Sequence, residues 1–261
     1  MTARVLIPLL VVACLIGSAA RATGYATQRQ ILDAIAFEQH IGERLPGELR
    51  FIDADGDRVR LGELTDRPLV LILAWYNCPN LCSMVLDQVA IATSGLPFAS
   101  GDYRVVVVSI APAEGPADAR RMRERLRRLH GVTINNWHLL SGEKRAIDTL
   151  ASAIGFRYVY DAERKRYAHP AGMVVVSPGG RISRYLFGLR PASSDLRLAL
   201  LDAGQGKLGS PVDQILLRCY RFNPETGRYS LAVINVLRVA GGGTVLALAG
   251  LVLLLRRRER R

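Results

Sequence analysis

Two cysteines separated by three residues are the most reactive feature of the sequence. Cys78 and Cys82 lie in the segment YNCPNLC, between an apolar run typical of a strand and a stretch with a helical pattern. Residues at positions i and i+4 share one face of a helix, so both sulfurs would point the same way. The first turn of a helix favours a thiolate, because its free N–H groups and its dipole stabilise negative charge.

Three kinds of chemistry fit this pair: a metal site, a redox pair and a structural bridge. Two soft thiolates suit Cu(I), and one imidazole would complete a three-coordinate site that also accepts Cu(II). A thiol-disulfide oxidoreductase would use the same two cysteines without a metal. A structural bridge is disfavoured, because a disulfide that closes so short a loop removes little chain entropy. A peroxidase is disfavoured as well, since the sequence has no T-x-x-C motif.

The chain has four histidines, of which His169 is the best candidate for a third ligand. It lies in RYAHPAGMVVVSPGG, just before a strand that we expect beside the one leading to Tyr76. His40 is near the mature N-terminus, and His130 and His138 flank the end of a basic helix. A structural role stays an alternative for a lone histidine such as His169.

YNCPNLC, followed about ninety residues later by YAHPAGMVVVSPGGRISRYLFG, resembles the Sco/SenC family of membrane-tethered, thioredoxin-fold copper proteins. The resemblance runs from about Leu49 to Ala203. It implies that Cys78, Cys82 and His169 bind copper, as Cu(I) or Cu(II). It also implies a role in assembling the binuclear copper site of cytochrome c oxidase, by copper delivery or by reduction of the recipient's cysteines. The implied partners are the copper-site subunit of the oxidase and a periplasmic copper donor or thiol reductant.

Three features depart from the family pattern. Relatives often carry an aspartate before the histidine, where this chain has Ala168, so His169 lacks an expected hydrogen-bond partner. Relatives also often carry an acidic DP-x-RDT segment, where this chain has SIAPAEGPADA and lacks those partner-contact residues. Many relatives are tethered at the N-terminus, whereas the convincing membrane span here is C-terminal. Thioredoxin-like folds place a cis-proline before a strand, and HPAGMVVV predicts a cis His169–Pro170 bond.

Three other sulfur-containing residues are candidate ligands. Cys219 is the odd cysteine of the mature chain, and it would be a packed thiol, an intermolecular partner or a metal ligand. Met84 and Met173 are soft enough for copper, but their helical and strand spacing predicts that both are core residues.

The elements that position these residues alternate between strands and helices. Apolar runs and turn residues predict strands at 68–75, 102–112, 135–142 and 156–161, with hairpins at 48–64 and 172–188. Residues 27–46 predict a short amphipathic helix and a turn, and helical patterns cover 80–95, 115–131, 143–155 and 193–203. This order predicts an α/β fold with a mixed central sheet flanked by helices. The family resemblance makes the expected fold thioredoxin-like.

Both ends of the chain are apolar. Residues 1–22 have the layout of a signal peptide, with a retained anchor as the alternative, and a lipoprotein site at Cys14 is disfavoured. Residues 230–255 predict one transmembrane helix, and the arginines of the tail at 256–261 place the C-terminus in the cytoplasm. The thioredoxin-like domain (27–203) and a membrane-proximal linker (204–229) would then lie on the periplasmic side of a bacterial inner membrane.

The formal net charge of +12 does not indicate nucleic-acid binding, because nucleic acid is poorly accessible outside the membrane. Much of the charge lies in ARRMRERLRRLH, residues 119–130, where Met122, Leu126 and Leu129 mark the buried side of a helix. The arginines are either a solvated helix face or a docking face for an acidic partner or anionic lipid.

Overall fold

The computed structural model describes residue 31 and residues 34–78, 81–99, 101–131 and 136–208, with the side chains of 81 and 82 left out. Beyond these it describes only 222–223, 228–229, 241 and 244. The chain divides into two compact units, Met1–Leu208 and Gly209–Arg261. In the second unit, β12 (Phe222–Asn223) pairs with β13 (Arg228–Tyr229).

Several predictions fall on residues outside this description. They are the signal peptide at 1–22, most of the membrane span at 230–255, the basic tail, Cys14 and Cys219. Among the residues that are described, no helix is both long enough and apolar enough to cross a bilayer.

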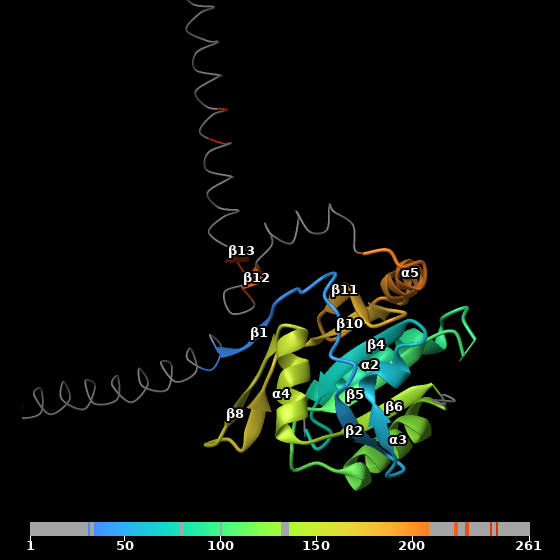
Figure 1. Ribbon diagram of the computed structural model, residues 1–261. Helices are drawn as coiled ribbons and strands as arrows, with labels where there is room; N and C mark the ends of the chain where they lie inside the picture. The colour runs from blue at the N-terminus through green and yellow to red at the C-terminus, as the bar shows by residue number, and fades with distance from the viewer. Residues whose placement is uncertain are drawn as a thin grey trace, which may run out of the picture. The chain divides into compact units, whose positions relative to one another are not determined.

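Seven strands of the first unit form one mixed sheet (Figure 1). In spatial order they are β11 (Arg181–Phe187), β10 (Gly172–Ser177), β4 (Leu69–Ala74), β5 (Arg104–Ser109), β6 (Trp137–Ser141), β2 (Arg50–Asp53) and β3 (Arg58–Arg60). The three central strands β4, β5 and β6 are parallel, and their neighbours β10 and β2 are antiparallel to them. The outer strands β11 and β3 pair antiparallel with β10 and β2. The predicted mixed central sheet is therefore confirmed.

The central strand β4 is buried on both faces, as its continuous apolar sequence LVLILA predicts. Because successive side chains point to opposite faces, alternate residues enter two different cores. Val70 and Ile72 lie in the core on one face, and Leu69 and Leu71 lie in the core on the other.

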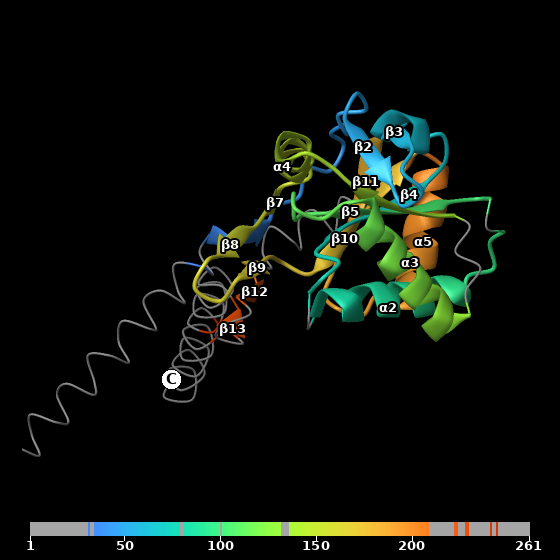
Figure 2. The ribbon, with the colours of Figure 1, turned by 90° about the horizontal axis from the view of Figure 1, so that it is seen from below.

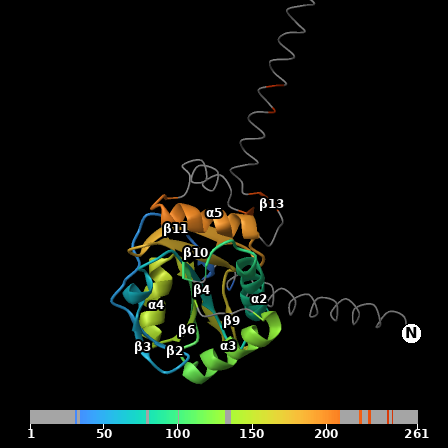
Figure 3. The ribbon, with the colours of Figure 1, turned by 90° about the vertical axis from the view of Figure 1, so that its right-hand side faces the viewer.

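Helices cover both faces of the sheet, with α4 on one side and α2 and α3 on the other (Figure 3). The first core is closed by α2 (Leu81–Ser94), α3 (Pro116–His130) and α5 (Ser193–Gly204). The second is closed by α4 (Lys144–Ala153) and the 3-10 helix η1 (Leu61–Leu64). Helix α3 ends at Gly131, whose left-handed backbone (φ 57°) is the C-terminal cap that the sequence predicts.

In the segment 27–46, residues 31 and 34 are helical and 41–42 form a turn, as predicted, but a strand that was not predicted lies between them. Residues Ala36–Phe37 form a short strand, β1, paired with β7 (Phe156–Arg157). The Phe37 ring lies 5.2 Å from Phe156 and 5.1 Å from Tyr185, so tertiary packing overrides the local helical pattern. Next to this pair only glycine fits at position 155, since an added Cβ would lie 2.2 Å from the Glu38 carbonyl oxygen.

The single strand predicted at 156–161 is two strands, β7 and β8 (Val159–Asp161). The sequence analysis also missed β9 (Arg166–Ala168), which pairs with β8 in a separate hairpin. Figure 2 shows this hairpin at one end of the unit, away from β2 and β3. Its three-residue strands are too short and too polar to stand out in the sequence.

Two residues predicted to be buried are exposed. Leu129 is 59% exposed and Met84 is 38% exposed, whereas Met173 is buried as predicted. At 100° per residue, position 129 lies at the margin of the stripe that contains Met122 and Leu126. Met84 lies on the opposite side of α2 from the residues that face the sheet.

Three of the six arginines of α3 bind residues outside this helix. Arg123 forms two hydrogen bonds of 2.6 and 2.7 Å with Asp55, and Arg120 donates to the Ala54 carbonyl oxygen. Arg125 donates to Asp87 of α2. Among the described residues, the side chains of Arg127 and Arg128 form neither a hydrogen bond nor an ion pair. Part of the basic helix is thus neither simply solvated nor free for docking.

Candidate metal centre and thiol site

Cys78 lies in a turn that follows the carboxyl end of β4. The turn begins after Ala74, and the Cys78 amide donates to the Trp75 carbonyl oxygen over 3.3 Å. The Cys78 side chain is half-buried and is a free thiol. Cys82 is the second residue of α2, but its side chain lies outside the described part of the structure. The shared orientation of the two sulfurs therefore stays a prediction.

His169 lies in the connection between β9 and β10, at the same edge of the sheet as Cys78. Strand β10 is antiparallel to its neighbour β4, with Val174 opposite Leu71, so β10 begins where β4 ends (Figure 1). The predicted adjacency of these two strands is confirmed. The fold brings Cys78 and His169 to one edge from positions about ninety residues apart.

The environment of His169 favours the imidazole form that binds metals. Its Nδ1 lies 2.9 Å from the Pro170 carbonyl oxygen, which only accepts hydrogen bonds and therefore keeps the proton on Nδ1. Burial lowers the pKa of His169 although the hydrogen bond with Pro170 opposes this effect. The ring is therefore neutral at pH 7, which is the form of histidine that binds metals.

The predicted cis His169–Pro170 bond is wrong. None of the peptide bonds in the described segments is cis, so this bond is trans. The trans isomer of an X–Pro bond is the lower in energy, and the connection from β9 to β10 is formed with that isomer.

The described donor atoms fit a copper ion. A cysteine thiolate and a neutral imidazole are ligands that copper prefers. Among the described side chains, no group of three or more His, Cys, Asp and Glu residues could hold a metal, and the Cys82 side chain is not part of that set. The three-residue ligand set therefore stays a prediction.

The other histidines lie elsewhere in the fold. His40 Nδ1 is 3.0 Å from the Ala153 carbonyl oxygen, and His130 Nε2 is 3.0 Å from an Asp87 oxygen. His130 ends α3, as predicted, and His138 lies within β6.

A buried carboxylate, Glu114, contacts the backbone that leads to Cys78. Its Oε2 accepts the Tyr76 amide over 3.0 Å, and its Oε1 accepts the Asn77 amide over 2.7 Å. The Ser109 hydroxyl donates to Oε2 over 2.5 Å. Burial raises the pKa of Glu114, and these hydrogen bonds counteract the shift only in part.

The sequence analysis missed Glu114 and Ser109, although one signal could have found them. Ser109 ends β5, and Glu114 follows it in SIAPAEGPADA. The carboxyl ends of parallel neighbours such as β4 and β5 meet at one edge of a sheet. The segment that departs from the family pattern therefore contacts the cysteine segment within this chain.

Two further contacts fix the same turn. The Asn77 side-chain amide donates to Asp118 Oδ1 over 2.8 Å, at the start of α3. The buried Tyr76 hydroxyl lies 2.9 Å from the Val107 carbonyl oxygen and 2.8 Å from that of Leu140. Burial raises the pKa of Tyr76 well above its usual value, so the hydroxyl keeps its proton.

Aromatic side chains connect the cysteine segment to His169. The Trp75 ring lies 5.5 Å from Tyr167, which lies 6.0 Å from Tyr158. Tyr158 is 6.3 Å from Phe156, whose ring lies 5.8 Å from His169. Phe156 belongs to β7, Tyr158 lies between β7 and β8, and Tyr167 belongs to β9. The unpredicted hairpin therefore contributes to the walls of the site.

Helix α2, which carries Cys82, is attached to α3 through Asp87. Arg125 donates to both oxygens of Asp87, over 2.9 and 2.7 Å, and His130 Nε2 lies 3.0 Å from Oδ1. Burial raises the pKa of Asp87, but the hydrogen bonds from Arg125 and His130 outweigh it. The pKa is therefore below its ordinary value of 3.8.

Asp87→Asn is expected to lower the free energy of unfolding at neutral pH by about 1 kcal/mol. Because the folded-state pKa is lowered, the ionised Asp87 stabilises the fold above pH 3.8, and this contribution is lost as the pH falls through the lowered value. Denaturant titrations of wild type and variant should therefore converge in acid. Glu124→Gln, at an exposed position of α3, is the control. An Asp87→Asn effect that persists in acid would contradict the ion-pair explanation.

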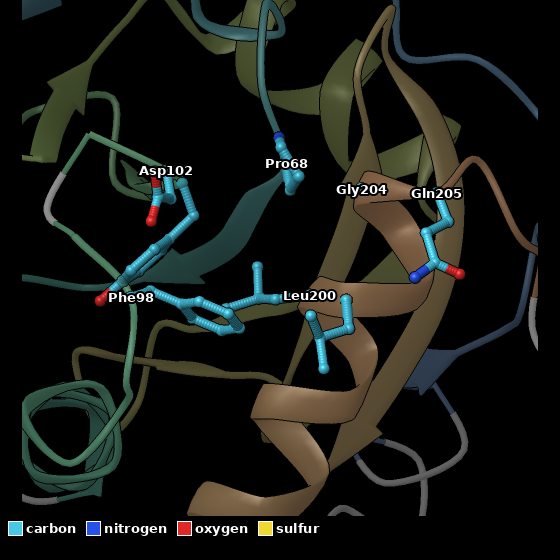
Figure 4. A pocket seen from close by; sticks show the side chains of 8 residues that line it. Pro68, Phe98, Asp102, Leu200, Gly204 and Gln205 are labelled. Carbon is cyan, nitrogen blue, oxygen red and sulfur yellow. The ribbon is translucent and has the colours of Figure 1, made fainter.

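A cavity of about 330 Å³ lies at the other end of the sheet. Pro68 and Tyr103 line it where β4 and β5 begin, and Leu200 of α5 closes another side (Figure 4). Cys78 and His169 lie at the opposite ends of these strands, so this cavity is not the thiol site.

A free thiol after a central strand, followed by a helix, with a histidine just before the neighbouring strand, defines an α/β thioredoxin-like protein with a thiol site. The chain belongs to the SCO1/SenC family, because the model of that family matches residues 38–196, more than half of its length. A comparison with curated proteins finds no significant match.

Solved structures with this fold include three from different organisms. A protein of Aquifex aeolicus VF5 superposes with a TM-score of 0.58 at 22% identity, covering 64% of this chain and 95% of its own. A SCO1/SenC family lipoprotein from Bacillus anthracis superposes with a TM-score of 0.56 at 16% identity, covering 64% of this chain and 99% of its own. Arabidopsis thaliana ScoI, described with copper bound, superposes with a TM-score of 0.52 at 19% identity, covering 64% of this chain and 99% of its own. At these identities the similarity shows the fold.

Proposed function

We propose that this protein is a copper-binding assembly factor for the binuclear copper site of cytochrome c oxidase. It delivers copper to that site or reduces the cysteines that will bind it. The observation that carries the proposal is the placement of the free thiol of Cys78 and the neutral imidazole of His169 at one edge of the sheet. Family membership and the copper in the related Arabidopsis structure support it.

Cys78, Cys82 and His169 are the proposed ligands, and copper is the cargo. Only thiolates bind the metal, so a disulfide between Cys78 and Cys82 would prevent loading. The redox state of the pair then decides whether the protein carries copper.

The proposed placement in the cell follows from the ends of the sequence. Residues 1–22 are a signal peptide, and 230–255 span the inner membrane of a bacterium once. The tail at 256–261 is cytoplasmic, and the copper-binding domain (27–203) is held on the periplasmic side by the linker at 204–229. In this compartment the partners would be the oxidase subunit and a copper donor or thiol reductant.

A second candidate is a metal-independent thiol-disulfide oxidoreductase outside the cytoplasm. The half-buried free thiol of Cys78 in a thioredoxin-like fold favours this alternative. Such an enzyme would use Cys78 and Cys82 and would not need His169.

A recipient-loading assay tests the proposal. The reduced full-length protein is expected to bind one copper ion and to load an apo copper domain of the oxidase, as followed by the absorbance of the recipient's copper centre. Protein with an oxidised cysteine pair should neither bind nor load, because its sulfurs are not thiolates. Equal copper binding in both redox states would contradict the proposal. Reduction of the recipient's cysteines by a protein that binds no copper would favour the oxidoreductase.

A further inference from the structure

The connection between β5 and α3 contacts the cysteine segment through Glu114. We propose that Glu114 is a positioning residue of the thiol site, which fixes Cys78 by binding the two backbone amides that precede it. The inference rests on the proposed function in one respect, because one effect of replacing Glu114 is measured as copper affinity.

The two amides need a partner because the strand has already ended. Strand β4 stops at Ala74, so the N–H groups of Tyr76 and Asn77 lie beyond its ladder of hydrogen bonds. Tyr76 is buried, and a buried amide without a partner is costly. Glu114 supplies one oxygen to the Tyr76 amide and the other to the amide of the more exposed Asn77. The carboxylate thus takes the place of a neighbouring strand for the two residues before Cys78.

Glu114 is itself held in place. Its side chain is only 6% exposed, and its Oε2 accepts the Ser109 hydroxyl. Its own amide donates to the Ala111 carbonyl oxygen over 2.9 Å, and the Ala111 amide donates to the Ser109 oxygen over 3.0 Å. This compact turn gives Glu114 little freedom to follow a displaced Cys78 segment, so the turn sets the position of the segment.

A carboxylate is needed because both of its oxygens face donors. A glutamine at position 114 would turn an NH₂ group toward Tyr76 or Asn77, so one amide would meet a donor and lose its hydrogen bond. The Cys78 segment would then move relative to His169 while the hydrophobic cores stay intact.

The test compares Glu114→Gln with Asp53→Asn in the full-length protein. Asp53 is a matched control, because its Oδ1 accepts the amides of Asp55, Gly56 and Asp57 in the turn between β2 and β3. That turn points toward the amino ends of the parallel strands, away from Cys78. Both variants replace a carboxylate that binds backbone amides with a neutral amide side chain, and only Glu114 contacts the cysteine segment.

Two readouts need no copper. Hydrogen exchange of the Tyr76 and Asn77 amides is expected to accelerate about 10–100-fold in Glu114→Gln, since hydrogen bonds to a charged group are lost. Alkylation of Cys78 by iodoacetamide, followed on its own peptide in a Cys82→Ser background, should also become faster.

The third readout uses copper. Cu(II) affinity, measured with the cysteine pair intact, should fall by roughly 10–100-fold, as when a ligand loses its supporting contact. Asp53→Asn should leave all three values near those of wild type.

Unchanged exchange and alkylation in Glu114→Gln would overturn the proposal. So would equal changes in both variants, because the effect would then come from general destabilisation. If wild type binds no copper but Glu114→Gln still alters exchange and alkylation at the segment, the positioning role stands and the copper function fails. If Glu114→Gln does not fold, Ser109→Ala replaces it, since this variant removes one of the contacts to Oε2. In Ser109→Ala, increases in exchange and alkylation that are smaller than those expected for Glu114→Gln support the proposal, and unchanged exchange and alkylation overturn it.

Discussion

His169→Ala is expected to abolish tight Cu(II) binding. Two thiolates alone are enough for Cu(I), but Cu(II) prefers a nitrogen ligand beside them. His169 supplies that nitrogen in the neutral form, because burial lowers its pKa and Nδ1 is bonded to the Pro170 carbonyl oxygen. The affinity should fall by more than the roughly 10–100-fold that loss of a ligand's hydrogen-bond partner costs.

Titration with Cu(II), followed by visible absorbance and electron paramagnetic resonance, measures this effect. His138→Ala is the matched control, because His138 lies within β6 and is expected to leave the affinity unchanged. An unchanged affinity in His169→Ala would remove His169 from the ligand set. Strong disulfide-reductase turnover by that variant would favour the oxidoreductase.

Phe156→Ala is expected to lower the free energy of unfolding by about 3–5 kcal/mol. The Phe156 side chain is 2% exposed, and its ring contacts those of Phe37, Tyr158 and His169. Truncation would leave a cavity between β1, β7 and the connection that carries His169. The variant should therefore also bind Cu(II) more weakly, because one wall beside the imidazole is gone.

Denaturant unfolding of the reduced, copper-free protein measures the loss through tryptophan fluorescence. Both tryptophans of the chain, Trp75 and Trp137, belong to the first unit, so the signal reports on that unit alone. Leu129→Ala, at an exposed position of α3, should change the stability by less than about 0.5 kcal/mol. A loss below about 1 kcal/mol in Phe156→Ala would contradict the packing explanation, since such a loss is typical of an average substitution.

Much of the candidate site could be predicted from local sequence. Cys78 follows an apolar run that could only be a strand buried on both faces, and His169 precedes a second such run. Placing these two strands side by side was enough to bring the thiol and the imidazole to one edge. The same argument could have placed Glu114, which follows β5, at this edge. Its role could not be predicted, because its partners are backbone amides, which have no signature in the sequence.

The sequence by itself determined the central strands, four of the helices, and the positions of Cys78 after β4 and Cys82 in α2. These features follow from short-range patterns: continuous apolar runs, helical periodicity and a capping glycine such as Gly131. Only the tertiary structure decided that Phe37 enters a strand, that Met84 and Leu129 are exposed, and that Glu114 binds the segment before Cys78. These outcomes depend on contacts between residues far apart in the chain, whose energies outweigh the small preferences that local sequence expresses.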